Sequence, residues 1–154
     1  MNTLLLLLPE LIITAVAFAI LTLDLIWKDN RRSAAIWPWL ALAGAVGAAG
    51  ATVYIWPLAG ERGVVVGNAA LPMLALDQLA LFSKLLAALT VALVGLSAAD
   101  YLKTRTPFRG EFYALTLLAG LSMMLLSSAT NLIMIYLALE FLSITSYILT
   151  GYLR

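Results

Sequence analysis

The chain has 154 residues, of which 64% are hydrophobic and 11% are charged. Soluble domains carry about 25% charged residues, so this composition predicts an integral membrane protein embedded in a lipid bilayer. The net charge of +1 gives no basis for binding nucleic acid. The chain has no Cys and no His, which excludes disulfides, thiolate-bound clusters and the usual metal and haem ligands. We therefore expect no metal and no cofactor to be bound by this chain.

Five apolar segments are long enough to cross a bilayer, which takes about 20 helical residues. They lie near residues 3–27, 34–57, 77–100, 111–128 and 131–152. Residues 1–100 thus hold three spans, with a short loop at 58–76, and residues 111–152 hold a helical hairpin. The predicted fold class is an all-α integral membrane protein with five transmembrane helices.

The loop between the second and third spans leaves two structures open. Val64–Val66, followed by Gly67, Asn68 and further apolar residues, fits a small β-hairpin. An irregular loop fits these residues equally well.

Basic residues are concentrated on one side of the predicted membrane. With the N-terminus outside, the only basic residue in an outside position is Arg62. The inside positions hold Lys28, Arg31, Arg32, Lys103, Arg105, Arg109 and Arg154. Because cytoplasmic loops carry an excess of Lys and Arg, we predict that the N-terminus lies outside. The first apolar run precedes the first basic residue, unlike a signal peptide, and no transit peptide is apparent. These features indicate a multi-pass protein of the bacterial plasma membrane.

A carboxylate in the middle of the last span is the first candidate functional residue. Glu140 lies within the apolar run IYLALEFLSITSYIL, and Tyr136, Ser143 and Tyr147 share its helical face. A charge at the bilayer centre costs about 2.5–3.5 kcal/mol on insertion scales, and such residues commonly serve ion or proton transfer. We predict that Glu140 is a proton relay on a polar stripe facing a protein interior. A structural Glu held by a hydrogen bond is the alternative.

The third span contains a second candidate charge. Lys84 lies about 10 Å along the helix axis from Asp77, which is on nearly the same face. Lys84 either extends toward the outer surface or pairs with a residue on another helix. Glu10 and Asp24, near opposite ends of the first span, are expected to be interfacial.

Three stretches of the chain resemble subunit N of respiratory NADH:quinone oxidoreductase (complex I), also called ND2. They are MNTLLLLLPELIITAVAFAILTLDL, LDQLALFSKLLAALTVAL and EFYALTLLAGLSMMLLSSATNLIMIYLALEFLSITSYIL. The last is the most specific, with its Glu followed by Leu-Ser and then Tyr-Ile-Leu. The related L and M subunits and Mrp-type cation/proton antiporters usually have Pro shortly after that Glu, where this sequence has Ser and Thr.

The resemblance implies a proton-translocating membrane-arm subunit that couples quinone reduction to proton movement. Such a subunit has no redox centre, works beside other complex I membrane subunits, and serves a complex that uses NADH and quinone. The family's fifth-helix Glu, here Glu140, pairs with a Lys on a broken seventh helix. Family members are about three times longer and contain two inverted five-helix repeats, so we expect this chain to be an N-terminal fragment with a truncated repeat. An Mrp-type antiporter subunit and a five-span structural membrane protein are the alternatives.

Overall fold

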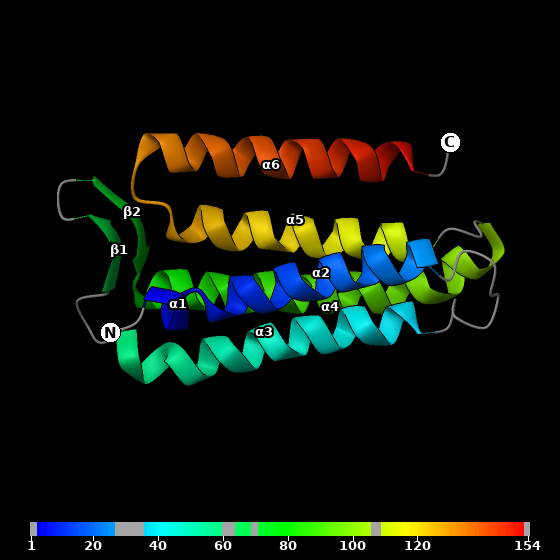
Figure 1. Ribbon diagram of the computed structural model, residues 1–154, viewed down its shortest axis with the longest axis horizontal. Coiled ribbons are helices and arrows are strands. Elements are labelled where there is room, and N and C mark those ends of the chain that lie inside the picture. The colour runs from blue at the N-terminus through cyan, green and yellow to red at the C-terminus, as the bar shows by residue number, and fades with distance from the viewer. Residues whose placement is uncertain (1–2, 27–35, 60–63, 69–70, 106–108, 153–154) are drawn as a thin grey trace.

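The computed structural model describes residues 3–26, 36–59, 64–68, 71–105 and 109–152 (Figure 1). Its long helices are α2 (Leu8–Ile26), α3 (Trp37–Ala59), α4 (Gln78–Arg105), α5 (Gly110–Ser128) and α6 (Leu132–Gly151). All five are long and apolar enough to cross a membrane. The prediction of five transmembrane helices is therefore confirmed, although α4 continues beyond the predicted end at residue 100.

The first predicted span is divided into two helices. A short helix, α1 (Thr3–Leu6), ends just before α2 begins at Leu8. Pro9 lies in the first turn of α2, where its missing N–H leaves no intrahelical hydrogen bond unmade. The proline therefore suits the beginning of α2.

Four of the long helices form a closed bundle. Helix α2 packs against α3 and α5, and α4 packs against the same two helices, so α2 and α4 face each other across the bundle. The shared core is rich in small side chains, including Ala17, Ala45, Ala48 and Ala88. Small residues let helices approach closely where lipid, rather than water, surrounds them. Helix α6 lies outside this bundle and packs on α5 (Figure 1).

A two-stranded sheet closes one end of the bundle. Strands β1 (Val64–Asn68) and β2 (Leu71–Leu76) pair antiparallel, which confirms the hairpin alternative for this loop. The remaining described elements are all helices, in agreement with the predicted all-α membrane fold class. The hairpin and the α5–α6 turn lie at one end of the bundle, and α2, α4 and α6 end at the other (Figure 1).

The hairpin is fixed to the turn that begins α6. Thr130 donates its backbone N–H to the Met73 carbonyl at 3.1 Å and its hydroxyl to the Pro72 carbonyl at 2.9 Å. Leu74 and Ala129 form an isolated β-bridge beside these bonds. The α5–α6 turn is thereby tied to a segment nearly sixty residues earlier in the chain.

We expect Gly120→Ala to destabilise the bundle by about 1–3 kcal/mol, the usual range for overpacking. A Cβ at Gly120 would overlap Cγ2 of Val91, across the contact between α4 and α5. Unfolding in mild detergent would measure the loss, and Gly120→Ala combined with Val91→Ala should recover part of it. Gly95→Ala is the matched control because its Cβ would meet Tyr113 at an ordinary 3.9 Å. Equal stability of Gly120→Ala and the wild type would contradict this packing.

The predicted orientation can be tested by cysteine labelling, because the chain has no natural Cys. Met73 is about half exposed on the hairpin, and Asp100 is exposed toward the opposite end of α4. We expect Met73→Cys to react with a membrane-impermeant maleimide in intact cells and Asp100→Cys to react only after permeabilisation. The reverse pattern would place the N-terminus inside.

Candidate functional site

The Glu140 stripe lies in the middle of α6, on a face turned away from α5. Glu140, Tyr136 and Tyr147 are exposed in this chain, and Ser143 is partly buried. The opposite face holds the buried Ala138 and Thr145. The helical positions of the stripe are as the sequence predicts. The stripe does not, however, face the interior formed by the described residues.

Two features of the stripe bear on its chemistry. The Tyr136 side chain hydrogen-bonds with that of Glu140, one helical turn away. Neither α6 nor the adjacent α5 contains a Lys or an Arg within its bounds. Any cationic partner for Glu140 would have to come from another segment or another subunit.

The remaining hydroxyl groups of α6 bond to their own helix. Thr145, Ser146 and Thr150 each donate to the backbone carbonyl four residues earlier, at 2.8–2.9 Å. Such bonds satisfy a hydroxyl inside an apolar helix without a partner from elsewhere. These three groups therefore add no link between Glu140 and the rest of the chain.

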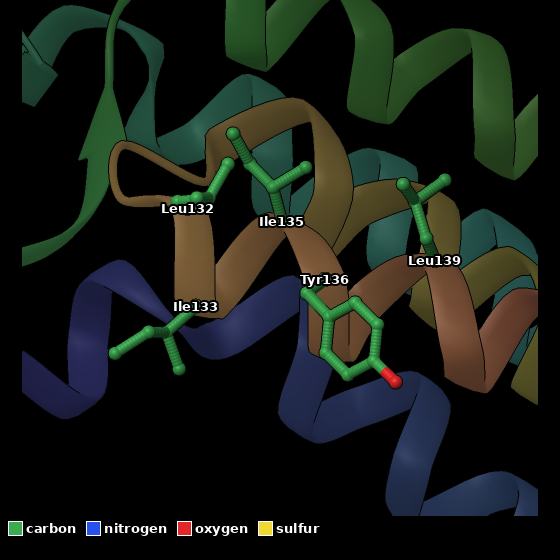
Figure 2. Close-up of a pocket in the computed structure, with 5 residues that line it drawn as sticks. All are labelled: Leu132, Ile133, Ile135, Tyr136 and Leu139. Atoms are coloured by element: carbon green, nitrogen blue, oxygen red, sulfur yellow. The ribbon is translucent and has the colours of Figure 1, made fainter.

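A hydrophobic depression lies beside the stripe on α6. Its volume is about 460 Å³. Five residues of α6 line it, and Figure 2 labels them: Leu132, Ile133, Ile135, Tyr136 and Leu139. Apart from the Tyr136 hydroxyl these side chains carry no polar atom, so the depression offers an apolar surface. It suits lipid or another helix, and provides no set of groups for binding a polar cofactor.

The second buried charge has a partner on another helix. The Lys84 ammonium lies 2.5 Å from a Glu10 carboxylate oxygen, and the two side chains are 0% and 6% exposed. The pair thus spans the bundle from α4 to α2, and Glu10 and Lys84 are the only charged residues buried in the part of the chain that the structure describes. Of the two alternatives for Lys84, pairing with another helix is the one seen.

The structure also places the two acidic residues near the pair. Glu10 lies in the first turn of α2, where it is buried within the protein and paired with Lys84. Asp77 is exposed in this chain, and its carboxylate accepts the Ala80 backbone N–H at 2.7 Å and caps α4. One sequence signal could have found the pair: Glu10 and Lys84 lie at similar distances from the predicted outer ends of their spans.

Asp24 joins the opposite ends of α2 and α5. Its carboxylate hydrogen-bonds with the Gly110 backbone, and a Cβ at Gly110 would lie 2.5 Å from the Asp24 carboxyl carbon. The partly exposed Asp24 therefore sits at the end of its helix, as expected for an interfacial residue. A negative side chain at a helix N-terminus is stabilising there.

Metal ligation finds no support in the described part of the chain. It contains no group of three or more His, Cys, Asp or Glu side chains that could hold a metal ion. Ionisable side chains within membrane-spanning helices are candidates for holding or moving a proton, and this applies to Glu140 and separately to Glu10 and Lys84.

Comparison with known proteins gives consistent relatives over nearly the whole chain. The chain is 38% identical over 146 residues to NADH-quinone oxidoreductase subunit N of Dehalococcoides mccartyi, covering 95% of this chain and 28% of that protein. It is 33% identical to NAD(P)H-quinone oxidoreductase subunit 2 of Synechocystis over 147 residues, covering 96% and 27%. The chloroplast subunit 2 of Mesostigma viride is 35% identical over 147 residues, covering 96% and 28%. No family model matches the chain.

These matches confirm the resemblance to the subunit N and subunit 2 family. The chain spans about three tenths or less of the length of these relatives. With its five apolar helices, the similarity identifies a multi-pass membrane protein related to this family.

We expect Glu10→Leu to destabilise the bundle by about 3–5 kcal/mol, because it leaves the Lys84 charge buried without its partner. The double variant Glu10→Leu with Lys84→Met should be close to wild type, because a buried ion pair can often be replaced by apolar residues. Thermal unfolding of all four forms in detergent would complete the double-mutant cycle. Additive losses from the two single changes would mean that the side chains do not interact.

Proposed function

We propose that this chain, a relative of subunit N of NADH-quinone oxidoreductases over most of its own length, is part of a proton-translocating subunit of such a complex. The supporting observation is Glu140, an acidic residue at the middle of an apolar helix with a hydrogen-bonded Tyr136 beside it. In this role the chain carries no electrons. It contributes to an enzyme whose other subunits oxidise NADH and reduce quinone.

Glu140 acts in this proposal as a proton relay that depends on a cation from outside α5 and α6. A carboxylate exposed to hydrocarbon would be costly, so the stripe needs a protein or water-lined partner on its open face. The resemblance implies a Lys on a seventh helix of the family as that partner. Gain or loss of the partner's charge would favour release or capture of the Glu140 proton.

The polar side chains beside Glu140 have supporting roles. Tyr136 orients the carboxylate through its hydrogen bond, while Ser143 and Tyr147 extend the polar face along the helix toward its C-terminus. Lys84 has a different position in this proposal. It lies in the bundle core and is paired with Glu10, so it does not serve as the partner of Glu140.

The proposed setting is a multi-pass subunit in contact with lipid and with other membrane subunits of the complex. The open face of α6 is its contact with protein, and the N-terminus faces outside in the predicted orientation. The bacterial plasma membrane is the proposed location. The relatives named above are quinone oxidoreductase subunits, which favours this function over an Mrp-type antiporter or a purely structural membrane protein.

We expect Glu140→Gln in the full-length subunit to slow proton transfer through this site by about a hundred-fold, in the range of general acid–base groups. The amide keeps the size of the side chain and its hydrogen bond with Tyr136 but cannot carry a proton. Proton uptake per NADH oxidised, measured in membrane vesicles, is the readout, with assembly checked by native electrophoresis.

Glu111→Gln is the matched control, since Glu111 is an exposed glutamate in the first turn of α5. It should leave proton translocation unchanged. Normal translocation by an assembled Glu140→Gln complex would rule out the relay.

A further inference from the structure

The buried pair of Glu10 and Lys84 has hydrogen-bonding capacity that the described residues do not use. Both carboxylate oxygens and the ammonium nitrogen are inaccessible, and none makes a hydrogen bond with a third group in the part of the chain that the structure describes. An ammonium group has three donors and a carboxylate has about four acceptor positions. Each charged group therefore has the other as its only partner among the described residues.

The surroundings of the pair contain few charges. Helix α3 and strand β2 have no Asp, Glu, Lys or Arg within their bounds, and the ionisable Tyr54 of α3 is exposed. On α2 and α5 the other acidic residues, Asp24 and Glu111, lie at the opposite end of the bundle. Asp77 is about 10 Å along α4 from Lys84 and caps that helix. The other charged residues of α4, Asp100, Lys103 and Arg105, follow Lys84 by four helical turns or more. Among the described residues, Glu10 is the ion-pair partner of Lys84.

Such a pair can exchange a proton internally. When a proton moves from Lys84 Nζ to Glu10 Oε1, an N–H bond breaks, an O–H bond forms, and both groups become neutral. Charges held away from water cost free energy, and this internal transfer removes both charges without exchanging a proton with solvent. A proton arriving from water can then bind the free amine and give the site a charge of +1. No oxidant, reductant or other co-reactant is required.

An apolar cluster separates the pair from the hairpin end of the bundle. It consists of Leu6, Ile55, Leu74, Leu76 and Leu81, each at most 6% exposed. Leu6 lies one turn before Glu10 on the α1–α2 segment, and Leu81 lies one turn before Lys84 on α4. Strand β2 supplies Leu74 and Leu76, so it covers this end of the bundle. We name these five residues the apolar cap.

The apolar cap is connected to the turn that leads to Glu140. Leu74 lies in the same strand as Pro72 and Met73, whose carbonyls accept the two hydrogen bonds from Thr130. Asn131, the next residue, caps α6 by accepting the backbone N–H groups of Ile133 and Met134. Movement of the beginning of α6 would therefore act directly on β2 and on the apolar cap over the pair.

We propose that Glu10 and Lys84 form a proton-binding site distinct from Glu140, and that strand β2 is its gate. With β2 in place the apolar cap excludes water and the pair keeps its proton. Displacement of β2 lets water reach the pair and the proton exchange. The site's ligand is the proton, and the proposal holds whether or not Glu140 is a relay.

Infrared spectroscopy of the full-length subunit in its membrane complex tests this proposal. We expect a carboxyl C=O band that disappears in Glu10→Gln, remains in Glu140→Gln, and shifts slowly after transfer to deuterated water. Leu74→Ser should accelerate that shift by about ten-fold or more, because a polar side chain weakens the packing of the apolar cap and favours local displacement of β2. Met73→Ser is the matched control, since Met73 neighbours Leu74 but is half exposed.

The outcomes separate the parts of the proposal. Absence of a Glu10 carboxyl band over the pH range where the protein stays folded would mean a permanently charged structural pair and would overturn the proton site. An unchanged exchange rate in Leu74→Ser would overturn the gate. If Leu74→Ser does not fold, Leu74→Ala loosens the same contact with a smaller change, and the same comparison with Met73→Ser applies.

Discussion

The bundle is organised around the cost of placing charge in a medium that cannot solvate it. The four helices α2–α5 enclose the ion pair between Glu10 and Lys84, and that pair joins the two helices that face each other across the bundle. Separating the two partners leaves an uncompensated buried charge. Apolar side chains between the same helices could instead slide past each other in small steps. The pair therefore restricts how α2 and α4 can rotate and slide relative to each other.

The other acidic groups at helix ends follow from the same cost. Asp77 caps the beginning of α4, and Asp24 meets the beginning of α5 at Gly110. Both sites use helix N-terminal N–H groups, which carry partial positive charge and lack an intrahelical acceptor. Glu140 is the exception, since it lies in the middle of α6 with only Tyr136 as a described partner. That contrast singles Glu140 out as a residue whose environment depends on something beyond α5 and α6.

The membrane spans were predictable because a run of about twenty apolar residues is the length of a helix that crosses a bilayer. The hairpin was open because Gly67-Asn68 signals a turn in a β-hairpin and in an irregular loop alike. The partner of Lys84 was not predictable in identity: helical periodicity relates residues on one helix, such as Lys84 and Asp77, but does not say which helices become neighbours. Likewise, periodicity placed Tyr136, Ser143 and Tyr147 with Glu140 but did not show that α5 packs on the opposite face.

Helix α5 separates the two charged sites, and β2 connects them along a different route. Glu140 lies on the outer face of α6, while Glu10 and Lys84 lie inside the ring formed by α2–α5. A direct electrostatic effect between them would have to act across a whole helix. A mechanical connection is more direct. Thr130 is hydrogen-bonded to β2, and the next residue, Asn131, caps the beginning of α6. Hydrogen bonds and packed leucine side chains adopt discrete arrangements. A shift of α6 would therefore either keep the whole of β2 packed on the bundle or displace it. Any coupling between these sites should therefore depend on the Thr130 hydroxyl more than on the charge of either glutamate.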